Sequence, residues 1–220
     1  MAELARDFRM EREGFGLHTR HTIQRRSDDA ARREWWGMDT ELVIHARNGD
    51  QQAFAALADS AYGRLHQIAF RILRDRPAAE DATQQAVLSM WRDLPQLRDP
   101  DRFEAWSYRL LVNACNSEFR RRKRLLPTIA DAMAIEPVAP DAFGHLADRD
   151  QVERGFASLS LDHRVVLVLR YYLDLSLDSI AETLDVPIGT VNSRLHRALG
   201  RMRDALKEAD LAELAEGAVR

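Results

Sequence analysis

The sequence contains a single cysteine, Cys115, among its 220 residues, and it has no long apolar run. One thiol excludes a disulfide framework and a cysteine-rich zinc site, and the seven histidines show no metal-ligand spacing. No segment approaches the roughly 18 apolar residues that would indicate a membrane span. The N-terminal stretch lacks the apolar core of a secretory signal peptide. We therefore expect a cytoplasmic protein that is not inserted in a membrane and binds neither metal nor cofactor.

The chain also lacks the alternating apolar pattern of strands and a large overall charge. Charged residues make up 30% of the sequence, but the formal net charge is only -3. Any affinity for nucleic acid must therefore come from local clusters of basic residues. Apolar residues instead recur at helical spacing, as in Leu57, Ala61, Leu65 and Ile68. The predicted fold class is all-α, with two small helical domains joined by a flexible linker.

The predicted domains follow changes in this helical pattern. Residues 1–38 have few aliphatic side chains and are expected to be a disordered extension, although a translation start at Met38 is an open alternative. A first domain is predicted for 39–124, a proline-containing linker for 125–149, a second domain for 150–208 and a C-terminal tail for 209–220. In the first domain, Gly49 ends one helix, Asp50 caps the next and Pro77 begins a third. The other expected helices are 101–124, 152–159, 161–173, 177–184 and 188–207.

The stretch SLDSIAETLDVPIGTVNSRLHRALGRMR, residues 176–203, predicts two helices joined by a tight turn. Ser176 is expected to cap the first of them. Asp185 stands in the turn, at a position where left-handed backbone is usual and which Asp tolerates better than most residues. The side chains expected to be buried are Ile180, Ala181 and Leu184 on the first helix, and Val191, Leu195, Leu199 and Met202 on the second.

The second helix of this pair carries several arginines and no acid before Asp204. The N-terminal residues of such a helix contact base edges in the major groove, and Arg197 is long enough for a bidentate contact with guanine. Arg194 and Arg201 are better placed for phosphates. A solvated basic face is the alternative. The candidate residues for duplex DNA are Gly189, Thr190, Asn192, Ser193, Arg194, His196, Arg197 and Arg201.

The fourth helix of the first domain, DRFEAWSYRLLVNACNSEFRRRKR, ends in five consecutive basic residues, 120–124. Its start interleaves aromatic and cationic side chains, a pattern typical of surfaces that stack unpaired bases. Phe103 and Trp106 are three residues apart and also suit a helical core, so that alternative stays open. The candidate residues for a single strand are Arg102, Trp106, Arg109, Asn113, Asn116, Ser117, Arg120 and Arg121.

The third helix offers a polar strip of Asp81, Gln84 and Gln85, which we expect to lie opposite Val87, Leu88 and Trp91. A polar strip close to exposed apolar edges suits a protein partner better than DNA, although an ordinary solvated face is the alternative. The candidate residues for this protein contact are Asp81, Gln84, Gln85 and Leu88.

Three segments together, AEDATQQAVLSMW, FEAWSYRLLVNACNSEFRRRKR and LSLDHRVVLVLRYYLDLSLDSIAETLDVPIGTVNSRLHRAL, resemble successive regions of bacterial RNA polymerase sigma factors of the extracytoplasmic function (ECF) group. The resemblance implies that the first domain binds the clamp helices of the largest subunit of core RNA polymerase through the face holding Asp81, Gln84 and Gln85. It implies capture of the melted −10 element by the 94–102 loop and the fourth helix, and reading of the −35 element by the helix after Pro187. It also implies an anti-sigma partner.

Two residues depart from the family pattern. Gln85 stands where the family usually has Glu, and Ser117 stands where Asp or Asn is frequent.

Two other functions are alternatives to the sigma-factor interpretation. A stand-alone dimeric helix-turn-helix regulator would not need the 81–85 strip or the basic fourth helix. An enzyme acting on DNA would need clustered carboxylates or an activated nucleophile, and neither is visible, so no catalysis is predicted.

Overall fold

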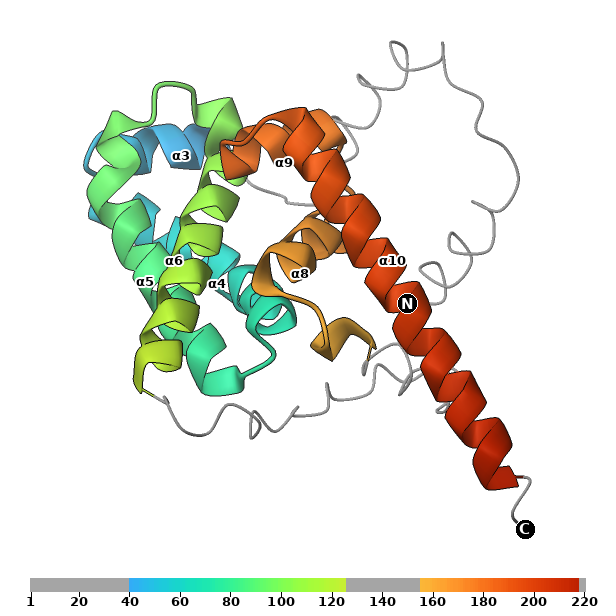
Figure 1. The fold of residues 1–220 in the computed structure, drawn as a ribbon. Helices are drawn as coiled ribbons and strands as arrows, with labels where there is room; N and C mark the ends of the chain where they lie inside the picture. The colour runs from blue at the N-terminus through green and yellow to red at the C-terminus, as the bar shows by residue number, and fades with distance from the viewer. Residues whose placement is uncertain (1–39, 126–154, 218–220) are drawn as a thin grey trace. The chain divides into compact units, whose positions relative to one another are not determined.

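The computed structural model describes residues 40–125 and 155–217 (Figure 1), and the side chains of 40–124 and 155–207. Every regular element in these ranges is a helix, which confirms the predicted all-α class. The described chain divides into two units, one up to Ser60 and one from Ala61. That division falls inside a continuous helix. The predicted extension lies outside the described residues, as does nearly all of the predicted linker.

The first two helices begin and end where local rules place them. Helix α3 spans Thr40–Arg47, and Gly49 follows it with a φ of 99°. Helix α4 spans Gln51–Leu73. Asp50 Oδ1 accepts hydrogen bonds from the amides of Gln52 at 2.9 Å and Ala53 at 3.1 Å, so it caps α4 as expected.

Helix α5 spans Arg76–Asp93, and small side chains form its buried face. Asp75 is its N-cap and accepts from the Ala78 amide at 2.8 Å. This places Pro77 at the second helical position, one later than predicted, where its missing N–H is equally harmless. The fully buried residues of α5 include Ala79, Ala86 and Met90. Alanines at the contact let the neighbouring helix α6 pack closely against α5 (Figure 1).

Two short 3-10 turns, η1 Leu94–Gln96 and η2 Pro100–Arg102, lead into helix α6, Phe103–Leu125. Phe103, Tyr108 and Leu111 are buried on α6, so Phe103 belongs to the core. Cys115 is fully buried, and burial raises the pKa of its thiol to about 12. This cysteine is therefore a small core residue and not a reactive thiol.

The second described segment opens with helical residues 155–157, while 152–154 of the predicted helix lie outside the described residues. Helix α8 spans Leu161–Leu167, and the chain then widens into a π-helical turn, η3 Val168–Tyr172. The predicted helix over 161–173 is thus present over 161–172, but its second half is π-helical and not α-helical. The turn is closed by the Leu173 amide, which donates to Val168 O at 3.1 Å, and by Arg170, which donates to Leu175 O at 3.0 Å.

Helices α9, Leu177–Leu184, and α10, Ile188–Gly217, form the predicted helix-turn-helix. Ser176 Oγ accepts from the Ser179 amide at 3.1 Å and caps α9 as expected. On α10, Val191, Ala198 and Met202 are buried, whereas Leu195 and Leu199 are only half-buried. The predicted stripe needs this correction because seven residues make almost two turns at about 100° per residue, which places 198, not 199, in line with 191.

The buried face predicted for α9 needs a similar correction. Ile180 is fully buried and Ala181 and Leu184 are half-buried, while Thr183 is buried although it was not expected to be. Helix α10 continues to Gly217, ten residues beyond its predicted end, through what was expected to be a tail. Between the predicted end at Lys207 and Gly217 the sequence has neither proline nor glycine, so no local signal ends the helix earlier.

The turn residue Asp185 has a left-handed backbone, with φ 55° and ψ 47°. A β-branched side chain is strained there, whereas Gly and Asn tolerate this region. We expect Asp185→Val to lower the free energy of unfolding of the second domain by about 1–2 kcal/mol. Asp185→Asn controls for the lost charge and should remain within about 0.5 kcal/mol of the wild type. Urea midpoints measure both, and equal midpoints for the Val and Asn variants would contradict the turn assignment.

Candidate nucleic-acid and protein interfaces

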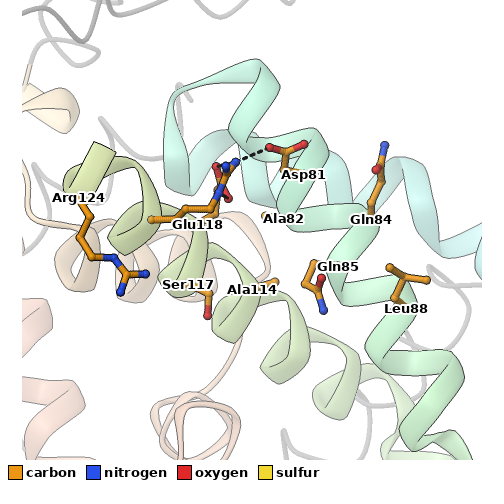
Figure 2. Close-up of a pocket in the computed structure, with 10 residues that line it drawn as sticks. Asp81, Ala82, Gln84, Gln85, Leu88, Ala114, Ser117, Glu118 and Arg124 are labelled. Atoms are coloured by element: carbon orange, nitrogen blue, oxygen red, sulfur yellow. Dashed lines mark hydrogen bonds and ion pairs between the residues drawn. The ribbon is translucent and has the colours of Figure 1, made fainter. Parts of the chain in front are cut away.

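One face of α5 carries the candidate residues for a protein contact. Asp81, Gln84, Gln85 and Leu88 are all exposed, and Leu88 retains 63% of its accessible surface. Figure 2 shows the four on the same side of α5. The expectation that Leu88 lies opposite Asp81 is therefore wrong, because seven residues complete nearly two helical turns. An exposed leucine beside two amides is a surface suited to a protein partner.

A groove of about 550 Å³ separates this face of α5 from the C-terminal half of α6 (Figure 2). Its α6 side includes Ser117 and Arg121, two of the candidates for single-stranded DNA. The structure thus places these two beside the predicted protein-contact residues. The residues that line the groove are Asp81, Ala82, Gln84, Gln85, Leu88, Ala114, Ser117, Glu118, Arg121 and Arg124.

Ion pairs cross the end of this groove. Arg121 donates to both carboxylate oxygens of Glu118, at 2.7 and 2.8 Å, and to Asp81 at 2.9 Å. Arg122 donates to Glu118 at 2.8 Å and to Asp75 at 2.6 Å. The Glu118 side chain is only 8% exposed. The two hydrogen bonds from Arg121, joined by the one from Arg122, hold the pKa of the Glu118 carboxyl below its usual value, so Glu118 is a buried anion with two cationic partners.

The remaining candidates on α6 form one stripe, which begins just before the helix at Arg102. Successive members are alternately four and three residues apart, so they stay on one side of the helix. Arg102, Arg109, Asn113 and Arg120 are exposed, and Trp106 and Asn116 are half-buried. The Trp106 ring contacts that of Phe103 at 5.7 Å between centroids, tilted by 48°. Trp106 therefore belongs partly to the core and keeps one portion open to solvent.

The candidates on α10 differ in how far they are already engaged. Gly189, Asn192, His196, Arg197 and Arg201 are exposed, whereas Thr190, Ser193 and Arg194 are half-buried. Ser193 Oγ donates to Thr190 O at 3.0 Å, and Arg194 forms an ion pair with Asp162 of α8 at 3.1 Å. Arg194 is therefore tied to α8, while no ion pair involving Arg197 occurs in the described part of the chain.

His163 lies buried on α8 behind the arginines of α10. Burial lowers its pKa, with further lowering by Arg201, Arg197 and Arg194 and an opposing effect of Asp162. Its Nδ1 is buried with no hydrogen-bond partner, as suits a neutral ring. Among the charges facing the imidazole, cations thus outnumber the one carboxylate.

This burial predicts acid sensitivity. Because the folded pKa of His163 lies below the unfolded value of about 6.5, the unfolded state binds the proton first, and stability falls as pH drops through that value. We expect His163→Leu to flatten the decline in unfolding midpoint between pH 7 and pH 5. Arg201→Gln, which removes the largest charge effect but not the burial, should flatten it partly. Urea denaturation at several pH values measures this, and an unchanged slope in His163→Leu would contradict it.

Two protein-family profiles match this chain, one in each predicted domain. The profile of sigma-70 region 2 matches residues 57–125, and that of sigma-70 region 4 matches 149–202. The ECF RNA polymerase sigma-E factor of Escherichia coli is 31% identical over 175 residues, which cover 73% of this chain and 90% of that protein.

The chain belongs to the ECF group of the sigma-70 family.

Other relatives agree with this membership. The ECF sigma factor SigW of Bacillus subtilis is 28% identical over 183 residues, covering 78% of this chain and 98% of SigW. The solved structure of the sigma factor RpoE in complex with the anti-sigma factor NepR from Bartonella quintana matches with a TM-score of 0.57 and 27% identity, over 70% of this chain and 96% of RpoE. CnrH, solved in complex with the cytosolic domain of CnrY, shares the fold at 24% identity and a TM-score of 0.56.

The predicted sigma function is therefore confirmed: the protein is a promoter-recognition factor of RNA polymerase, and the stand-alone regulator is not favoured. Within the sigma factor, region 2 includes α5 and α6, and region 4 includes α9 and the first part of α10. Among the described residues, no helix is long and apolar enough to span a membrane. Acidic residues that pair with the candidate cations were missed from the sequence, among them Asp75, Glu118 and Asp162.

Proposed function

We propose that this ECF sigma factor joins core RNA polymerase through one face of α5 and reads promoter DNA with α6 and α10. The observation that carries the proposal is that the three sets of candidate side chains remain largely exposed, each on its own helix. The protein has no catalytic step of its own in this function. It confers sequence specificity on the polymerase, in the cytoplasm.

The α5 face binds the clamp helices of the largest polymerase subunit. Leu88 supplies an apolar anchor for this contact, and large exposed side chains of this kind contribute most when a partner excludes water from them. Gln84 and Gln85 supply uncharged hydrogen-bonding groups beside it. Gln85 replaces the usual Glu of the family, so this contact uses an amide in place of a carboxylate.

The α6 stripe captures the melted −10 element, with the loop 94–102 at its start. The open portion of Trp106 offers a surface on which an unpaired base can stack, and Asn113 and Asn116 offer amides to base edges. Arg102, Arg109 and Arg120 lie along the same stripe at positions that suit phosphates. Ser117 lies at the margin of this surface, beside the groove.

The N-terminal half of α10 enters the major groove of the −35 element. Gly189 is exposed, and a Cβ placed there would meet no other part of the protein within 4 Å, so the space beside the helix start is open to the sugar-phosphate chain. Asn192 and Arg197 read base edges, with Thr190, Ser193 and His196 beside them. Arg201 contacts phosphate, and Arg194 does so only to the extent that Asp162 releases it.

We also propose an anti-sigma protein as a partner of this chain. The support is the resemblance to RpoE, which was solved in complex with the anti-sigma factor NepR. Such a partner would compete with core polymerase for the α5 face or with DNA for α6 and α10.

Transcription in vitro from a genomic fragment library, with core polymerase in the presence and absence of the protein, tests the proposal. New transcripts whose start sites share −35 and −10 sequences are the expected result. If no new starts appear while the protein alone binds duplex DNA as a dimer, the proposed function is wrong and the stand-alone regulator replaces it.

A further inference from the structure

The five basic residues at the end of α6 do not share one surface. Consecutive residues are about 100° apart around a helix, so a run of five passes around the whole circumference. Arg120, Lys123 and Arg124 fall within an arc of about 100° centred near the stripe that holds Asn113. Arg121 and Arg122 fall outside this arc, about 110° and about 150° from its centre. Helix geometry alone therefore divides the run into a group of three and a group of two.

The group of two is held by carboxylates. Arg121 is bound by Glu118 and Asp81, and Arg122 by Glu118 and Asp75, at distances between 2.6 and 2.9 Å. Three carboxylates thus surround two guanidinium groups. Glu118 is the central member, and because it is almost buried it needs both arginines to compensate its charge. If either arginine moved to a phosphate, the almost buried Glu118 carboxylate would lose one of its two compensating cations.

Within residues 40–125 and 155–217, the group of three has no such partners. Arg120, Lys123 and Arg124 are exposed, and no ion pair involving them occurs in the described part of the chain. Their charges are available to an external anion. Figure 2 shows Arg124 extended at the far end of the groove, away from Asp81.

We propose that Glu118, with Asp75 and Asp81, divides the basic run by function: Arg120, Lys123 and Arg124 bind the phosphates of single-stranded DNA, and Arg121 and Arg122 do not. Glu118 is then a positioning residue that withholds two cations from the DNA and joins α6 to α5. This rests on the proposed role of α6 in capturing a melted strand, and it moves Arg121 from the DNA-binding set to the structural set.

The test measures the salt dependence of binding of the full-length protein to a fluorescent 30-residue oligo(dT), by anisotropy. Each lost phosphate contact reduces the slope of log K against log salt concentration by about 0.7. We expect Arg120→Gln, Lys123→Gln and Arg124→Gln each to reduce the slope by about 0.7 and to leave the melting temperature unchanged. Arg121→Gln and Arg122→Gln should lower the melting temperature and leave the slope unchanged.

Glu118→Gln keeps a hydrogen-bond acceptor and removes the central charge. It should release cationic charge to the DNA and increase the slope by up to about 0.7. Glu80→Gln, an exposed position on α5, is the matched control for the change in net charge and should leave the slope unaltered. The expected pattern is therefore a reduced salt slope at 120, 123 and 124 and a reduced melting temperature at 121 and 122. If all five residues were purely structural, the salt slope would not change in the first group.

Three results would overturn the inference: an equal loss of slope in Arg121→Gln and Arg120→Gln, an unaltered slope in folded Glu118→Gln, or no binding of oligo(dT) by the wild type at low salt. None of these requires a promoter or polymerase. Failure here is therefore separable from failure of the transcription assay, which tests the sigma function itself.

Discussion

Replacing Leu88 with Arg is expected to weaken assembly with core RNA polymerase by at least about tenfold. The side chain is 63% exposed in the free protein, so its surface is available to be buried by the clamp helices. Burying a leucine contributes about 1.5–3 kcal/mol, equivalent to roughly 10- to 150-fold in the dissociation constant. A cation introduced at the same place adds a desolvation cost. Competition binding to purified core polymerase with a labelled sigma factor measures the effect.

The exposure of Leu88 also fixes the controls for this prediction. Because the side chain is not part of the core, Leu88→Arg should unfold at the wild-type urea concentration and bind oligo(dT) as the wild type does. Leu88→Met preserves the apolar contact and should assemble within about threefold of the wild type, because volume-conserving apolar exchanges cost little. Wild-type assembly by Leu88→Arg would remove α5 from the polymerase interface.

Local features of the fold could be predicted from the sequence because each depends on a few neighbouring residues. Asp50 and Ser176 cap their helices with the expected side-chain hydrogen bonds, and Asp185 takes the expected left-handed conformation. Cap and turn chemistry acts within three or four residues, so the order of residue types is enough to reveal it.

Face assignments were less accurate because they depend on the angle accumulated over several residues. The sequence interpretation puts Leu88 on the face opposite Asp81, but the two are seven residues apart and therefore share one face. It also puts Leu199 in the buried stripe, but Ala198 is the residue seven after Val191, and Ala198 is the one that is buried. Small residues such as Ala198 add to the difficulty. They mark the closest helix contacts but contribute little to an apolar pattern, so larger neighbours are chosen in their place.

The π-helical turn at 168–172 has no signal in an apolar run such as VVLVLRYYL. Its wider hydrogen bonds go together with a left-handed residue just beyond it, Asp174 at φ 49°, and with Arg170 donating to Leu175 O. A uniformly apolar stretch fixes burial but not the register of the backbone hydrogen bonds. The interactions that accompany the change of register, such as the Arg170 bond to Leu175 O, leave no trace in the apolar pattern.

The charged network could be only half predicted. Glu118 stands three and four residues before Arg121 and Arg122, the spacing of helical ion pairs, and this local pattern was available in the sequence. The pairs of Arg122 with Asp75 and of Arg194 with Asp162 join residues far apart in the chain. Only the packing of one helix on another brings them together, so the counting of exposed arginines from the sequence overestimates the charge available to DNA.

Arg197 and Arg194 on α10 provide a direct test of that argument. Both were predicted to contact −35 DNA, but Arg197 is exposed and Arg194 is paired with Asp162 at 3.1 Å. We expect Arg197→Ala to weaken binding of the holoenzyme to a −35 duplex by about 5- to 150-fold, the worth of a bidentate base contact, and to relax the preference at one base pair. Arg194→Ala should cost less than about fivefold, because much of that charge is already neutralised within the domain.

Asp162→Asn completes this comparison by freeing Arg194 without touching Arg197. It should increase the slope of log K against log salt by up to about 0.9, one additional phosphate contact. Anisotropy titrations of a duplex carrying a −35 sequence found by the transcription screen measure all three variants. The contrary result is that Arg194→Ala weakens binding as much as Arg197→Ala does and that Asp162→Asn leaves the slope unchanged. In that case Asp162 releases Arg194 when DNA binds, and the ion pair does not distinguish the two arginines.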